Sequence, residues 1–81
     1  MLKELASAPR VVGVKQSLAA LRGGKAAMVF CASDADPALL GKVEELCTQQ
    51  SVPIVRGATM AQLGQAAGIS VGAAVAAVLK R

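Results

Sequence analysis

The residues best suited to chemistry follow a glycine and are mostly basic. Gly13 precedes apolar residues at helical spacing, which predicts a helix with Gly13 as its N-cap and with Lys15 and Gln16 on its first turn. The N-terminus of a helix already presents free N–H groups and the positive end of the macrodipole. A lysine there opposes helix stability, and such a local cost often marks a site that faces an anion.

The basic residues are concentrated in the first third of the chain. Arg22 and Lys25 follow the glycine, and no carboxylate lies between Arg10 and Lys25. The net charge is +4, and most of the acids lie in the middle of the 81 residues. A segregated basic surface suits a polyanionic partner. Charge alone is equally compatible with an ordinary solvated surface.

The sequence argues against an enzyme. It contains no His and no Tyr, and Cys31 therefore lacks the usual base that would activate a nucleophile. Asp34 and Asp36 are close in sequence, but Asp36 before Pro37 is typical of a helix start, with the aspartate as cap. We therefore expect no catalytic residue, no metal site and no cofactor.

RNA is the polyanion that the residue types favour. The single aromatic residue, Phe30, lies in an apolar run, so no platform for stacking bases is available. Recognition must then use helix ends, loops and hydrogen bonds to exposed base edges. The residues Ile69-Ser70-Val71 form an apolar loop that could pack on an extruded base. Taken alone, however, they favour a plain loop whose Ile and Val belong to the core.

Helical and strand-like patterns alternate along the chain. Residues 26–32 form a continuous apolar run, which predicts a strand covered on both faces, and Ile54-Val55 resembles a second strand. Residues 71–79 fit a helix and a strand almost equally, and we interpret them as a buried strand. The alternation predicts one domain, residues 1–81, folded as a three-layer α/β/α sandwich. The helix after Pro37 has an expected buried stripe of Leu39, Leu40, Val43, Leu46 and Cys47.

The remaining features indicate a small cytoplasmic protein. The two cysteines make no disulfide framework and suit buried thiols in a reducing compartment. The N-terminus lacks the apolar segment of a signal peptide. The most apolar run, residues 66–79, is shorter than the ~20 residues that a membrane-spanning helix needs. We expect no membrane association and a monomer.

Several short motifs, in order, resemble the kink-turn RNA-binding ribosomal proteins (the L-seven-Ae family), and most of all its short bacterial YbxF-type members. The similarity covers nearly the whole chain, and the last motif is the most specific. The motifs are Gly13-x-Lys15-Gln16, Arg22-Gly23, Asp34-Ala35-Asp36-Pro37 and Leu63-Gly64-x-Ala66-x-Gly68-Ile69-x-Val71-Gly72-Ala73-Ala74.

This resemblance implies a mixed four-stranded sheet, with the last segment as a strand. It also implies binding to kink-turns, in which tandem sheared G·A pairs and a short bulge bend RNA sharply. By position, Gly13, Lys15 and Gln16 would enter the major groove beside the G·A pairs. Ile69, Ser70 and Val71 would cover the bulge, while Arg22 and Lys25 would contact phosphates. The expected partner is a structured RNA, not DNA, in the ribosome or another ribonucleoprotein.

Two departures from the family pattern bear on affinity and RNA preference. Many relatives have Asn-Glu where this chain has Lys15-Gln16, and Ala19 occupies a place where lysine is common. A different class of function also remains open, namely a protein-interaction or structural module with a generic basic surface. The loop Ile69-Ser70-Val71 distinguishes the two, because an RNA-binding role needs it exposed and a core role would bury it.

Overall fold

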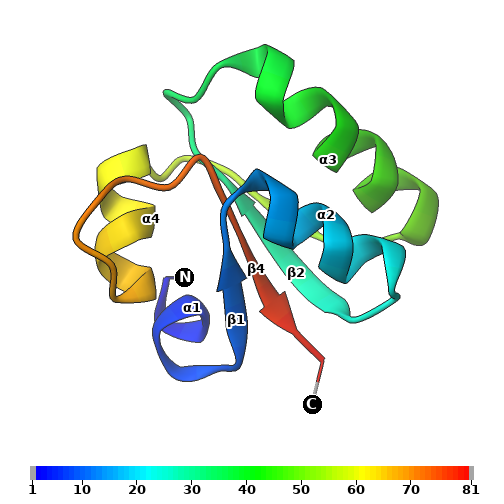
Figure 1. The fold of residues 1–81 in the computed structure, drawn as a ribbon, viewed down its shortest axis with the longest axis horizontal. Coiled ribbons are helices and arrows are strands. Elements are labelled where there is room, and N and C mark those ends of the chain that lie inside the picture. The colour runs from blue at the N-terminus through cyan, green and yellow to red at the C-terminus, as the bar shows by residue number, and fades with distance from the viewer. Residues whose placement is uncertain (1, 81) are drawn as a thin grey trace.

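Helices and strands alternate along the whole of the computed structural model, which describes residues 2–80 (Figure 1). This order confirms the predicted alternation. The elements are α1 (Lys3–Ser7), β1 (Arg10–Val12), α2 (Val14–Arg22), β2 (Ala26–Cys31), α3 (Pro37–Gln50), β3 (Ile54–Val55), α4 (Met60–Ala67) and β4 (Val75–Leu79).

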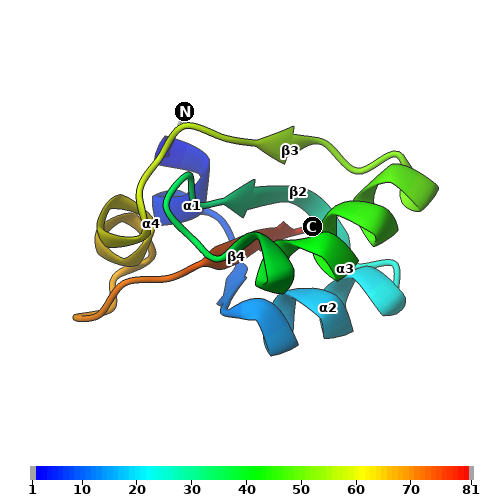
Figure 2. The ribbon, with the colours of Figure 1, turned by 90° about the horizontal axis from the view of Figure 1, so that it is seen from above.

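The four strands form one mixed sheet in the order β1-β4-β2-β3. Strand β4 is antiparallel to both β1 and β2, whereas β2 and β3 are parallel. Helices α2 and α3 lie together over one face, and α1 and α4 pack together on the other side (Figures 1 and 2). The predicted three-layer α/β/α sandwich is therefore confirmed.

The last strand is an interior strand of the sheet and consists of valines and alanines up to Leu79 at its end. Val75, Ala76 and Ala77 are fully buried, and successive side chains point to opposite faces. Small side chains allow helices to pack closely on both faces. Pairing with two neighbouring strands outweighs the helical propensity of the alanines, because propensity is a weak preference that tertiary context overrides.

This strand is shorter than predicted. Residues 71–74 precede it as a loop, because the backbone up to Ala73 turns toward α4, and Ala74 bonds only to Ala32, just after β2. The Ala73 N–H donates to the Met60 carbonyl at 3.0 Å, whereas ladder pairing begins at Val75 opposite Cys31.

Side-chain caps begin α3 and α4, and the first of them confirms the helix start predicted at Asp36-Pro37. The Asp36 carboxylate accepts from the Ala38 N–H at 2.9 Å, and Pro37 occupies the first turn of α3. At α4, the Thr59 hydroxyl accepts from the Gln62 N–H, while the Gln62 side chain accepts from the Thr59 N–H, which makes a capping box. These two caps fix where α3 and α4 leave the carboxyl ends of β2 and β3.

Two expectations about burial are wrong. Leu39 does not belong to the buried stripe of α3 and is 50% exposed. The buried residues Leu40, Val43 and Cys47 follow helical spacing, and Leu39 lies about 100° around the helix from Leu40. Strand β2 is also not covered over its whole length, because Ala27 is exposed near its start.

The two cysteines are buried free thiols, as predicted. Among residues 2–80, every helix falls short of the length and apolar character that crossing a bilayer requires.

Candidate nucleic-acid interface

The first turn of α2 is open to solvent and has a positive character. Gly13 is its N-cap with φ +99°, a conformation that favours glycine, and a Cβ there would meet nothing within 4 Å. Within the described chain, no side chain caps α2 and its first turn holds no acid. Lys15 and Gln16 are both exposed on this turn. Free N–H groups, an ammonium and an amide therefore converge where an anion or a base edge could approach.

The loop between α4 and β4 exposes apolar side chains on a fixed backbone. Val71 is 68% exposed and Ile69 is 37% exposed, so the interpretation that places these residues in the core is wrong. The loop backbone nevertheless packs tightly on α4. The Ile69 N–H donates to the Gly64 carbonyl at 3.0 Å, and a Cβ at Gly64 would overlap the Val71 carbonyl oxygen.

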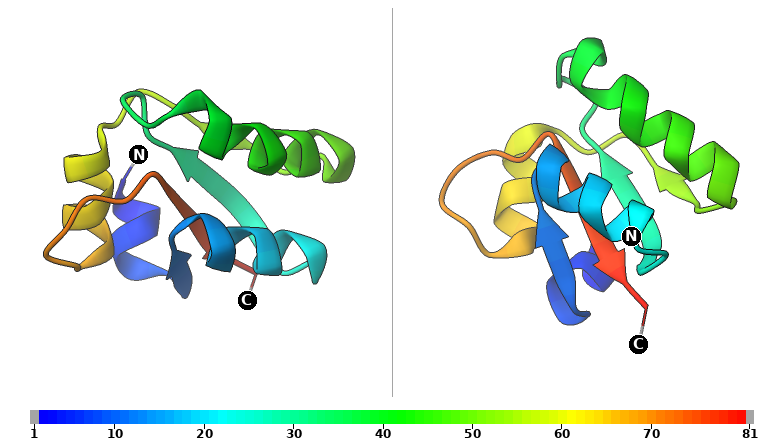
Figure 3. Two further views of the ribbon diagram at one scale, coloured as in Figure 1. Left: turned by 45° about the horizontal axis from the view of Figure 1, so that its top comes forward. Right: turned by 45° about the vertical axis from the view of Figure 1, so that its right-hand side comes forward.

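The first turn of α2 and the end of this loop lie at the same end of the sheet (Figure 3). The Gly13 N–H donates to the Val75 carbonyl at 2.8 Å, at the start of β4. Next to it, the Ala32 N–H donates to the Ala74 carbonyl at 2.9 Å. The predicted residues Gly13, Lys15 and Gln16 therefore lie near the point where the segment that follows Ile69–Val71 enters the sheet.

The other two predicted residues lie at the opposite end of α2. Arg22 is in its last turn, and Lys25 is the last residue of the link into β2. The helical rise of ~1.5 Å per residue separates the backbones of Lys15 and Arg22 by about 10 Å. The structure therefore divides the predicted site into a loop-side group and a far group.

Two further cations adjoin these groups and were missed in the sequence. Arg10 donates from Nε to the Ala67 carbonyl, at the end of α4, at 3.1 Å. The Lys80 N–H donates to the Lys25 carbonyl at 2.8 Å, which adds Lys80 to the far group. An arginine at the start of a valine strand was a visible signal for the first. Detecting the second required knowing how β2 and β4 pair.

These cations have no carboxylate partner in residues 2–80. The two ion pairs found there involve acids of α3: Lys42 with Glu45, and Arg56 with Glu44. The positive charges of Lys15, Arg22 and Lys25 are therefore available to an external anion.

The acid pair serves the fold. Asp36 caps α3, and Asp34 Oδ1 accepts from the Met60 N–H at 2.8 Å, which links the β2–α3 loop to the start of α4. Residues 2–80 contain no group of three or more His, Cys, Asp or Glu side chains that could hold a metal ion. These contacts support the structural interpretation of the two aspartates.

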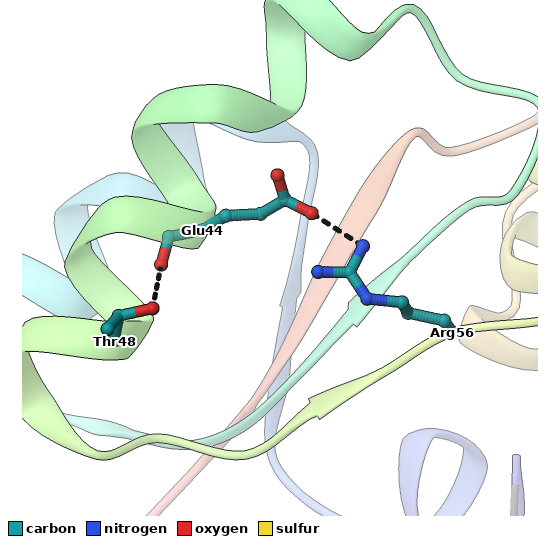
Figure 4. A network of polar contacts seen from close by, with 3 residues as sticks. All are labelled: Glu44, Thr48 and Arg56. Carbon is teal, nitrogen blue, oxygen red and sulfur yellow. Dashed lines mark hydrogen bonds and ion pairs between the residues drawn. The ribbon is translucent and has the colours of Figure 1, made fainter.

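A separate open pocket of about 340 Å³ lies between α3 and the ends of β2 and β3. Its rim carries the ion pair of Glu44 and Arg56, and the Glu44 carbonyl accepts from the Thr48 hydroxyl at 3.0 Å (Figure 4). Burial, with a further contribution from Glu44, raises the pKa of the Cys31 thiol in its wall to about 11. The thiol therefore stays protonated at neutral pH and is a poor nucleophile.

Comparison with known proteins gives one family. The model of the ribosomal protein L7Ae/L30e/S12e/Gadd45 family matches residues 2–81. An RNA-binding protein of Geobacillus sp. (strain WCH70) is 42% identical over 78 residues, which cover 96% of this chain and 95% of that protein. The RNA-binding protein YbxF of Geobacillus stearothermophilus is 38% identical over the same shares of the two chains.

Solved structures show the same fold. The Giardia lamblia 15.5kD RNA binding protein superposes with a TM-score of 0.86 at 32% identity, covering 99% of this chain and 68% of that one. A protein of unknown function from Bacillus halodurans also gives a TM-score of 0.86, at 24% identity and covering 98% and 83% of the two chains. The second likeness concerns the fold alone.

Proposed function

Because the chain belongs to the ribosomal protein L7Ae/L30e/S12e/Gadd45 family, we propose that this RNA-binding protein recognises kink-turn RNA and stabilises its bent form. It is a binding protein and not an enzyme, as the sequence predicted. The observation that carries the proposal is a helix start that no side chain of the described residues caps, bearing Lys15 and Gln16, whose Gly13 N–H is bonded to the start of β4, the strand that follows an exposed apolar loop.

The helix start is suited to the sheared G·A pairs. Lys15 and Gln16 present donors on an exposed turn, and guanine presents its O6 and N7 acceptors in the major groove. No atom lies within 4 Å of the place where a Cβ of Gly13 would be. Because glycine has no Cβ, a ligand can approach the backbone there. In our proposal, these three residues contact the G·A pairs.

The loop is suited to the bulge. Unpaired nucleotides can be splayed out, and their faces then need an apolar surface. Val71 and Ile69 offer aliphatic side chains to solvent, and Ser70 adds a hydroxyl between them. A backbone held against Gly64 presents these side chains without a large ordering cost on binding.

The far group supplies charge. Arg22 and Lys25 are exposed and suit phosphates of an RNA arm that runs along α2. One chain carries the helix start, the loop and the far group, and we propose that a monomer binds the RNA, within the ribosome or another ribonucleoprotein.

The mechanism is a shift of an RNA equilibrium. A kink-turn exchanges between an extended and a bent form. A protein that binds the bent form more tightly shifts the equilibrium toward that form, by an amount set by the ratio of its two affinities. In our proposal, the helix start and the loop contact the sheared pairs and the bulge at once in the bent form and not in the extended form.

The test uses a kink-turn duplex with a donor and an acceptor dye at its two ends. Without Mg²⁺ the duplex is extended, and adding the protein should raise energy transfer to the level of the bent form. A duplex whose G·A pairs are changed to Watson–Crick pairs should show no rise. A protein that binds both duplexes without changing energy transfer would be a generic polyanion binder.

A further inference from the structure

Arg10 sits where α4 gives way to the loop that carries Ile69 and Val71. Its Nε donates to the carbonyl of Ala67, the last residue of α4, at 3.1 Å. Its Nη1 donates to the Ala8 carbonyl at 3.3 Å. Its Nη2 lies against Gly68, where an added Cβ would be 3.5 Å away.

The Arg10 guanidinium lies where the C-terminus of α4 needs hydrogen-bond donors and positive charge. The last carbonyls of a helix have no partner within it and carry the negative end of the macrodipole. A guanidinium supplies both a charge and several donors in a fixed planar arrangement. Arg10 therefore fixes the point at which the chain turns through Gly68, which has φ +83°, into the loop.

The rest of the loop is held by other contacts. The Ile69 N–H donates to Gly64, the Val71 backbone packs on Gly64, and the Ala73 N–H donates to Met60. All of these contacts are to α4 itself. Arg10 is the side chain that ties the beginning of the loop to β1 and to the end of α1, elements outside α4.

We propose that Arg10 is a positioning residue, which orders the loop between α4 and β4 before RNA arrives. The proposal rests on the RNA-binding role of that loop given above. Two of its donor nitrogens are directed at protein carbonyls, so it acts through the loop and not as a phosphate contact. An ordered loop loses less conformational freedom on binding, which strengthens affinity.

Two variants separate positioning from charge. Arg10→Ala removes both, whereas Arg10→Lys keeps the charge and loses the planar arrangement of donors. Each should speed hydrogen exchange of the Gly68 and Ile69 amides in the free protein, because both amides are hydrogen-bonded next to the site of the change. Each should weaken kink-turn binding about fivefold, with no change in the slope of log affinity against log salt.

Gln50→Ala is the matched control. The Gln50 side chain also donates to a helix-end carbonyl, that of Leu21, at 2.6 Å, but from α3 and far from the loop. Its loss should lower stability without changing loop exchange or RNA affinity. This control separates a local effect on the loop from general destabilisation.

The outcomes are distinct. Unchanged exchange at Gly68 and Ile69 in Arg10→Ala would overturn the proposal. Full affinity in Arg10→Lys, with a slope about one unit lower in Arg10→Ala, would also overturn it and make Arg10 a phosphate contact. Faster exchange with unchanged affinity would show that the order of the loop does not contribute to RNA binding, and would overturn the proposal. Loss of discrimination by the unaltered protein between kink-turn and Watson–Crick duplexes would instead refute the proposed function itself.

Discussion

The two ends of α2 carry similar charge but differ in shape. At its start, no side chain of the described residues caps the helix, and an apolar loop on a packed backbone enters the sheet at the same end. At its C-terminal end, Arg22 and Lys25 lie with Lys80, whose N–H donates to the Lys25 carbonyl. These three residues supply charge. Charge without shape attracts any polyanion, whereas fixed donors and apolar surface can distinguish one RNA from another. We therefore assign selectivity to the first end and general affinity to the second.

The largest effect should come from the glycine beneath the loop. A Cβ in Gly64→Ala would overlap the Val71 carbonyl oxygen, so the loop must move or α4 must shift. We expect a stability loss of about 3 kcal/mol and at least about a hundredfold weaker kink-turn binding. Denaturant unfolding and RNA titration measure the two.

Gly41→Ala is the control for that change. Gly41 lies in α3 with nothing within 4 Å of an added Cβ, and alanine favours helices over glycine by ~0.5–1 kcal/mol. This variant should be slightly more stable and bind RNA normally. Equal behaviour of the two variants would contradict the tight packing between α4 and the loop.

The helix start should give the next largest effects. Lys15→Ala should weaken binding about tenfold and, because it removes a cation from the interface, lower the salt slope by up to about one unit. Gln16→Ala should leave the slope unchanged and reduce the preference for sheared G·A pairs, because a neutral amide discriminates between base edges. Titrations at two salt concentrations measure both. Wild-type affinity, salt slope and base preference in both variants would show that RNA does not bind at the start of α2.

The exposed loop should give a smaller effect of a different kind. Val71→Ser changes a side chain that is 68% exposed, so stability should change by no more than about 0.5 kcal/mol. Binding should weaken about fivefold for a kink-turn with its bulge, at unchanged salt slope. A duplex without the bulge should bind both proteins alike. An equal loss of affinity for both duplexes would show that Val71 does not contact the bulge.

The far end should give the smallest effects. Arg22→Ala and Lys25→Ala should each weaken binding about threefold and lower the salt slope by up to about one unit. The loss should be the same for kink-turn and Watson–Crick duplexes. Lys42→Ala, which removes a charge from the exposed ion pair with Glu45, serves as the control and should change little. If Lys25→Ala lost affinity only for the kink-turn, the end of α2 would also contribute to selectivity, contrary to our assignment.

Local signals explain how much of the fold was predictable. Asp36-Pro37 marked a helix start that depends only on neighbouring residues. The start of β4 could not be located in this way, because the Ala73 amide is drawn to Met60, which is distant along the chain. Leu39 was misplaced because adjacent leucines give a helical pattern two possible registers.

The proposed site depends in the same way on local and distant signals. The assignment of Lys15, Gln16 and the loop to an RNA-binding site stays a prediction from residue types and order. The exposure of Ile69 and Val71 depends on tertiary packing, and the residues alone favoured the wrong answer. The contact of Arg10 with Ala67 joins residues 57 apart in sequence, and no local pattern indicates it.

The most direct test compares the affinity of the protein for a kink-turn duplex with its affinity for the same duplex carrying Watson–Crick pairs in place of the sheared G·A pairs. Both are measured at two salt concentrations. Our account predicts a preference of about a hundredfold or more for the kink-turn, which persists at the higher salt. Equal affinities that fall together with salt would contradict it.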